Sequence, residues 1–277
     1  ENVLLSYGAL LEGLNRAKPG HDFCFSICEW GKTQPQNWGY KVGDSWRILN
    51  DITFQVGSDG NPGRAAWEDK GTASITSQYN KAVIMDELAG LDRGWNDPDM
   101  LVIGMDGITT VMCRTHMTMW CVMNAPLMLG MDLRRIAKGD ALWNIIANRA
   151  VIALNQDKLG IQAKRIWCSI DSENPDTSYV TDNNRVDILA KPLADGAVAL
   201  CFINVSSENR REEYEVRRQD IVHYIGHKMV EKERFLNASR YQVTDLWTNA
   251  QWENTTGSFS VSGLDACDCV LYRITPV

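Results

Sequence analysis

The chain has 277 residues, of which 44% are hydrophobic and 23% are charged, so it has the composition of a globular protein that can bury a substantial core. The net charge of −7 argues against a nucleic acid or an anionic membrane surface as a partner. The longest apolar runs, such as residues 151–154, are far too short to span a bilayer.

Residues 1–160 alternate between helical and strand-like patterns. The first twenty residues have apolar side chains at helical spacing, and Lys18-Pro19-Gly20 ends that helix. The elements expected next are a strand at 23–28, a strand at 45–52, a mostly helical stretch at 65–91, a strand entered at 94–102, a buried helix at 109–125, a strand at 126–133 and a helix at 140–156. This alternation predicts parallel βα units, either half of a (β/α)8 barrel or a small doubly wound sheet.

Residues 161–277 have a different texture. Strand-like segments separated by Gly, Asn and Asp turns predict a second, antiparallel β domain. A heavily charged segment at about 207–237 interrupts them, and we expect an exposed insertion with a solvated helix there.

The eight cysteines are scattered and lack zinc-site spacing, so we expect neither a metal nor a cofactor. Reduced thiols weakly favour the cytoplasm. N-glycosylation triplets at Asn204, Asn237 and Asn254 weakly favour secretion, so the compartment is left open.

In a parallel barrel, functional side chains follow the carboxyl ends of the strands. The residues at those places are Cys28, Glu29, Trp30, Arg47, Asp51, Asp97, Asp99, Met100 and Asp132. The four histidines form no HExxH pattern, and neither GxSxG nor a phosphate-binding glycine loop occurs. The sequence therefore favours an acid-based mechanism, and glycoside hydrolysis is the commonest chemistry of two carboxylates.

Six segments carry a family resemblance. They are CEWG (28–31), VGDSWRILNDI (42–52), GWNDPDMLVIG (94–104), APLMLGMDLR (125–134), NQDKLG (155–160) and KPLADGAVALCFIN (191–204). In this order they resemble motifs of the melibiase-type family of glycoside hydrolases, which contains α-galactosidases and α-N-acetylgalactosaminidases. The resemblance implies a (β/α)8 barrel followed by an antiparallel β-sandwich, and a retaining mechanism in which one Asp attacks the anomeric carbon and another protonates the leaving oxygen.

The resemblance assigns the acid/base role to Asp51 and places Arg47 near the sugar and the nucleophile. Asp51 must hold a proton near neutral pH, which needs an apolar setting or a neighbouring carboxylate. Ile48, Leu49 and Ile52 are the residues that we expect to supply the apolar setting.

The substrate-binding residues implied by the resemblance lie on two other strands. Cys28 and Trp30 are expected to contact galactose, while Asp99 and Met100 close the pocket and Asp99 accepts bonds from sugar hydroxyls. Glu29 is a further candidate.

The roles of three acids follow from position. Glu29 is expected to bond either Arg47 or the pocket wall. Asp97 precedes a proline at a strand end and is expected to bond loop amides as scaffold. Asp132 is expected to be structural.

The nucleophile has no counterpart in this chain. The family carries it after the fourth barrel strand in a K-x-D-x-C motif, which occurs nowhere in the sequence. We therefore expect the chain to begin after strand four and to contain strands five to eight, so that the lack of a signal peptide says nothing about location. A half-barrel has open edges, and its expected partner is an N-terminal half-barrel, separate or lost; a homo-oligomer is the alternative.

The predicted function is removal of terminal α-linked galactose from oligosaccharides or glycoconjugates, with the isolated chain inactive. The bulky Trp30 loop disfavours an α-N-acetylgalactosaminidase. A β-L-arabinopyranosidase stays open, because its sugar is galactose without the C6 hydroxymethyl group. The alternative of another class is an inactive, sugar-binding or structural remnant.

Overall fold

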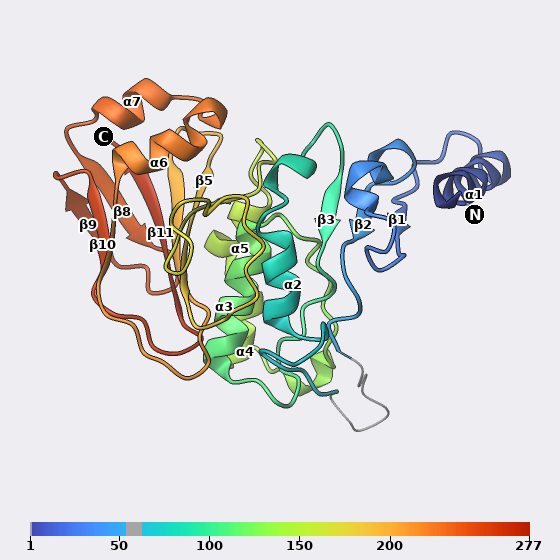
Figure 1. The fold of residues 1–277 in the computed structure, drawn as a ribbon, viewed down its shortest axis with the longest axis horizontal. Helices are drawn as coiled ribbons and strands as arrows, with labels where there is room; N and C mark the ends of the chain where they lie inside the picture. The colour runs from blue at the N-terminus through green and yellow to red at the C-terminus, as the bar shows by residue number, and fades with distance from the viewer. Residues whose placement is uncertain (1, 54–62) are drawn as a thin grey trace.

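The computed structural model describes residues 2–53 and 63–277 (Figure 1). The first part contains α1 (Val3–Ala17), β1 (Ser26–Ile27), β2 (Ser45–Arg47), α2 (Ile75–Ala82), β3 (Trp95–Asp97), α3 (Thr110–Val122), α4 (Ala141–Ile146) and α5 (Arg149–Asn155), with short 3-10 helices η1 (Pro35–Asn37), η2 (Gly39–Lys41), η3 (Asp86–Leu88) and η4 (Leu133–Arg135).

The second part is mostly β structure. It contains β4 (Lys164–Cys168), β5 (Val186–Pro192), β6 (Val198–Asn204), β7 (Tyr214–Arg217), α6 (Arg218–Ile225), η5 (Gly226–Lys228), α7 (Lys232–Asn237), β8 (Tyr241–Asp245), β9 (Gln251–Asn254), β10 (Ser258–Val261) and β11 (Cys269–Pro276).

The strands of the first part are parallel and lie in chain order. β1 pairs with β2, and β2 pairs with β3, so the carboxyl ends of all three meet at one edge. Beyond β3, Leu101 forms a parallel bridge with Leu129. The three strands and the segment at Leu129 thus form four parallel segments in chain order, as the motifs predict for the second half of a (β/α)8 barrel.

The prediction of a regular fourth strand at 126–133 is wrong. Among the described residues its segment pairs only through the bridge at Leu129, and Asp132 is already the N-cap of the 3-10 helix η4. The side chain of Met128 is 68% exposed. In the described chain this segment has a neighbour on one side only, so half of the ladder that would hold it extended is absent.

Two helical predictions also need correction. Within the stretch 65–91, α2 is confined to Ile75–Ala82, capped by the Ser74 hydroxyl. The helix expected at 140–156 is broken into α4 and α5, because the Asn148 side chain accepts the first amides of α5 and starts a new helix. By contrast, α1 and the buried helix α3 occur as predicted.

The β part consists of a six-stranded antiparallel sheet, in the order β4-β5-β6-β11-β8-β9, and a two-stranded sheet of β10 and β7. Every residue of β6 is buried. One face of the central strands joins the core around α3, and the other joins a core with β7, β10, α6 and α7. A strand covered on both faces is expected to be a nearly continuous apolar run, which explains VALCFI before the polar Asn204.

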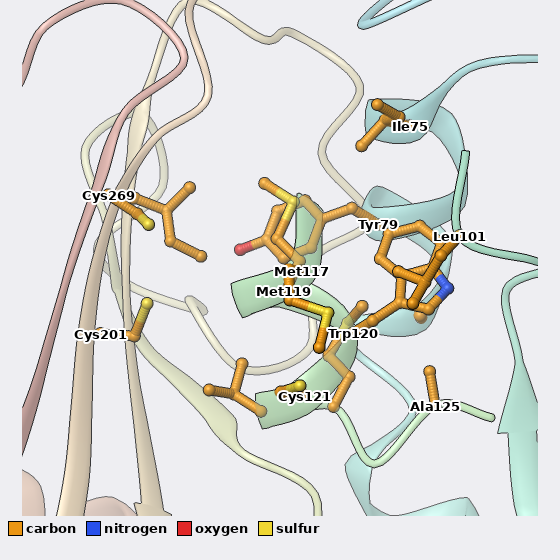
Figure 2. Packing of buried hydrophobic residues seen from close by; sticks show 14 of the residues in the cluster. Ile75, Tyr79, Leu101, Met117, Met119, Trp120, Cys121, Ala125, Cys201 and Cys269 are labelled. Carbon is orange, nitrogen blue, oxygen red and sulfur yellow. The ribbon is translucent and has the colours of Figure 1, made fainter. Parts of the chain in front are cut away.

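Helix α3 lies between the two parts. Figure 2 shows Met117, Met119 and Trp120 of α3 between the sheet residues Cys201 and Cys269 on one side and α2 on the other. One hydrophobic core therefore continues from the barrel strands through α3 into the six-stranded sheet. The β domain supports the helix that backs the strand ends.

The charged segment at 207–237 is not a solvated insertion. Its β7 pairs with β10, and the side chains of Ile221, Ile225 and Phe235 are fully buried. These apolar residues lie on the inner faces of α6 and α7, while charged residues cover the outer faces. The abundance of charge concealed an ordinary amphipathic pattern.

A buried ionic cluster also joins the two parts. Asp187 of β5 bonds Arg185 at 3.0 Å and Arg165 at 3.5 Å, and it accepts the Tyr79 hydroxyl of α2 at 3.0 Å. Burial alone would raise the pKa of Asp187, but the two guanidinium groups outweigh burial and hold that pKa below its ordinary value.

Lys191 makes a second buried connection. Its ammonium group donates to Asn124 Oδ1 at 2.7 Å and to the carbonyl of Ile161. Burial lowers the pKa of Lys191 to about 8.

All eight cysteines have free thiols in the structure. Within the residues that the structure describes, no helix has the length and apolarity to cross a membrane. The same residues contain no group of three or more His, Cys, Asp and Glu side chains placed to hold a metal ion.

Candidate active site

Arg47 is the centre of the candidate site. It is the last residue of β2, its side chain is 11% exposed, and its Nη2 donates to Asp51 Oδ1 at 3.1 Å and to Asp99 Oδ2 at 2.6 Å. The same nitrogen donates to the carbonyl of Asn50 at 3.2 Å. One guanidinium therefore joins the loops that follow two neighbouring strands.

Asp51 lies four residues beyond the end of β2, in the loop rather than on the strand. Its carboxylate is 53% exposed and accepts the indole N–H of Trp30 at 3.1 Å, besides Arg47. Ile48 and Ile52 are 1% exposed and belong to the core. The expectation of an apolar setting for Asp51 is therefore wrong, because hydrogen-bond donors and solvent surround its carboxylate.

Asp99 has an unusual backbone conformation, with φ of +76°, which side chains larger than hydrogen adopt rarely. Its Oδ2 accepts Arg47 and the amide of Ile52 at 2.8 Å, and its Oδ1 accepts the amide of Met100 at 2.7 Å. The Asp99 carboxylate thus binds three donors of the protein itself, two of them in the segment that carries Asp51.

Asp97 supports Asp99. Its Oδ1 accepts the amide of Asp99 at 2.8 Å, which is the bond to a loop amide expected of it. Burial raises the pKa of Asp97, although this amide and the Arg47 charge oppose the change.

Cys28 and Glu29 follow β1 at the same edge. Burial raises the pKa of the Cys28 thiol, against the opposing charge of Arg47, so the group is neutral near pH 7 and suits a van der Waals contact. Glu29 Oε2 accepts the amide of Thr33 at 2.8 Å. Glu29 therefore holds the turn that presents Trp30, whereas Arg47 bonds other acceptors.

The remaining two predicted residues lie around the same rim. Met100 is partly buried beside Gly130, where an added Cβ would lie 2.1 Å from the Met100 sulfur, so the glycine leaves room for this side chain. Asp132 caps η4 and bonds Arg134 at 2.8 Å, a structural role.

Trp120 was missed by the sequence analysis. Its indole N–H donates to the carbonyl of Asp99 at 2.8 Å. A tryptophan in a helix that is apolar all round predicts core packing, and nothing in the sequence separates that role from a contact to the site.

A cavity of about 460 Å³ lies elsewhere, at the amino ends of the strands. Ser45 and Trp95, which begin β2 and β3, line it together with Leu127 and Lys158. It is thus at the opposite end of the half-barrel from Asp51.

Four parallel segments with carboxylates at their carboxyl ends, joined to an antiparallel β-sandwich, define the class: part of a (β/α)8 barrel with an appended β domain. Residues 9–157 match the family described as Alpha galactosidase A, and residues 183–274 match the Alpha galactosidase C-terminal beta sandwich domain. The chain belongs to the alpha galactosidase A family, which is the melibiase-type family that its motifs resemble.

The chain is similar to the alpha-galactosidase of Cyamopsis tetragonoloba, with 33% identity over 93% of this chain and 51% of that protein. It is similar to alpha-galactosidase A of Cellvibrio japonicus, with 31% identity over 99% of this chain and 60% of that protein. The crystal structure of alpha-galactosidase I from Mortierella vinacea superimposes with a TM-score of 0.74 and 25% identity, over 98% of this chain and 62% of that one. The chain spans about half the length of the curated relatives that it matches.

Proposed function

We propose that this chain supplies the proton-donating half of a retaining α-galactosidase. One observation carries the proposal: the half-exposed carboxylate of Asp51, the guanidinium of Arg47 and the indole of Trp30 converge at the carboxyl ends of parallel barrel strands. Family membership supports galactose as the sugar, since the relatives are named alpha-galactosidases.

Each group has a physical task in this proposal. Asp51 is exposed enough to reach a glycosidic oxygen, to give it a proton and later to take one from water. Arg47 holds Asp51 from within the barrel, and its positive charge would favour an ionised nucleophile facing it. Trp30, 43% exposed, offers a flat face for the sugar ring, with Cys28 and Met100 as apolar walls and Glu29 supporting the turn.

The nucleophile belongs to a complementary set of strands in this proposal. Strand residues alternate between the helix side and the barrel interior: Ile27 of β1 is fully buried, whereas Cys24, Ser26 and Cys28 are exposed. Interior positions are filled in a closed barrel. We therefore infer that four further βα units cover this inner face and provide the attacking carboxylate.

The test uses the chain associated with that complementary half. Asp51→Asn should lower turnover of an alkyl α-galactoside by about 100-fold or more, because the poor leaving group needs the proton. A dinitrophenyl α-galactoside needs no proton and should lose far less. Asp132→Asn is the matched control, since Asp132 is a carboxylate of the same rim that bonds its own Arg134.

Equal losses of Asp51→Asn on both substrates would refute the acid/base role. Parallel assays with β-L-arabinopyranosides and α-N-acetylgalactosaminides test the sugar. If no glycoside is cleaved but calorimetry shows galactose binding to the chain, a sugar-binding remnant replaces the enzyme.

A further inference from the structure

Asp99 is held in its left-handed conformation from three directions. Its amide is bound by Asp97, and its carboxylate is bound by Arg47 and by the amide of Ile52. The third direction is the helix side, where the Asp99 carbonyl accepts the indole N–H of Trp120 at 2.8 Å. Because φ of +76° is unfavourable for an aspartate, these bonds must maintain it.

Trp120 is itself immobilised. It is fully buried in α3, and the ring of His116 meets it edge to face with centroids 4.1 Å apart. His116 Nε2 accepts the amide of Val102 at 3.1 Å. Two neighbouring side chains of α3 therefore bond the backbone of the segment 99–102 at two places.

The connection continues from Asp99 to the candidate acid. The Asp99 carboxylate binds the amide of Ile52, the residue next to Asp51, and it binds the guanidinium that also binds Asp51. A rotation of the Asp99 peptide would disturb both bonds together, because they share one carboxylate oxygen. Trp120 bonds the carbonyl of that residue and so opposes the rotation.

We propose that Trp120 is a positioning residue, which fixes Asp99 through its carbonyl and thereby fixes the loop that presents Asp51. Helix α3 then sets the place of the proton donor without touching substrate. The catalytic consequence rests on the proposed function, whereas the structural connection does not.

The first test measures amide hydrogen exchange in the 277-residue chain. In Trp120→Phe the Ile52 amide should exchange about fivefold faster or more, the effect of losing one hydrogen bond, relative to the Ile48 amide, which bonds a carbonyl of β3. Trp67→Phe is the matched control, because the Trp67 indole also donates to a backbone carbonyl, that of Val205 at 2.9 Å, and its side chain is also buried. It should leave the ratio of the two amides unchanged.

An unchanged ratio in Trp120→Phe, or an equal change in Trp67→Phe, overturns the proposal. Should Trp120→Phe not fold, benzothienylalanine at position 120 keeps the ring shape and lacks the N–H, and the same outcomes apply.

The second test measures turnover by the chain with its complementary half. Trp120→Phe should lower kcat about tenfold on an alkyl α-galactoside and much less on a dinitrophenyl one, because only the proton donor is displaced. Equal losses on both substrates contradict positioning of Asp51. If the wild-type protein cleaves no glycoside, the proposed function fails while the exchange experiment still decides the role of Trp120.

Discussion

Gly31 is the residue whose substitution should most directly perturb the loop next to the site. It has φ of +72°, and a Cβ added there would lie 2.1 Å from the carbonyl oxygen and 2.6 Å from the carbonyl carbon of Ile48. Both atoms are backbone, just beyond β2, so neither can rotate away. Gly31→Ala must therefore push the turn that carries Trp30 away from the loop of Asp51.

The magnitude follows from two contributions. A left-handed conformation costs an alanine about 1–2 kcal/mol. Ordinary Cβ contacts begin at about 3.4 Å, so the contact must open by more than 1 Å, and overpacking of this kind costs about 1–3 kcal/mol more. Gly20→Ala separates the two contributions, because Gly20 has φ of +74° and no described atom lies within 4 Å of its Cβ position.

The assay is urea unfolding of both variants and the wild-type chain. Gly31→Ala should lower the free energy of unfolding by about 1–3 kcal/mol more than Gly20→Ala does. Its Trp30 indole N–H should also lose the bond to Asp51, visible as a shifted indole resonance. A difference below about 0.5 kcal/mol between the two variants would refute the steric argument.

Three further predictions concern the β part. Asp187→Asn should cost about 3–5 kcal/mol at pH 7, because it leaves buried guanidinium groups without their counter-charge. The pKa of Asp187 in the folded chain lies below its ordinary value of 3.8, so the stabilisation by its ionised carboxylate is complete above that pH and shrinks as the pH falls. The substitution should therefore cost less unfolding free energy at pH 3 than at pH 7, and an equal loss at both would contradict the argument. The pKa of Lys191 falls from 10.5 to about 8 on folding, so the unfolded chain binds more protons between these pH values. The free energy of unfolding of the wild type should therefore rise by about 3 kcal/mol relative to that of Lys191→Met between pH 8 and 10.5. Parallel curves of stability against pH for the two proteins would exclude this linkage. Phe235→Ala should cost about 3–5 kcal/mol and the exposed Lys232→Ala less than about 0.5 in urea unfolding, whereas a solvated insertion would show no difference.

Local patterns predicted the elements that depend on local physics. The helix around 3–17 and the buried helix α3 follow from the spacing of apolar residues and from composition. The boundary between the parallel part and the antiparallel part follows from the spacing of the strands. Apolar periodicity failed at two places, one decided by a local helix cap and the other by tertiary packing. Asn148 divides one periodic run into two helices, and Ile221 and Phe235 make a charged segment part of the core.

The candidate site, like the fold, was predicted in part from the sequence. The order of motifs pointed to Arg47, Asp51 and Asp99, because these residue types follow successive strands, and the structure places the three around one guanidinium nitrogen. Their assignment as functional residues stays a prediction. Asp99 was expected to accept bonds from sugar hydroxyls, a role that stays a prediction. The structure shows its carboxylate binding the Ile52 amide, a contact between residues 47 positions apart.

By itself, the sequence determined which segments could be helices or strands, the family to which the chain belongs, and the set of acids available for chemistry. Only the tertiary structure decided which donors each of those acids binds. Hydrogen bonds with directed geometry, such as that from Trp120 to the carbonyl of Asp99, join residues distant along the chain. Periodicity reports the burial of a side chain, whereas the partner of its polar atom is fixed by packing.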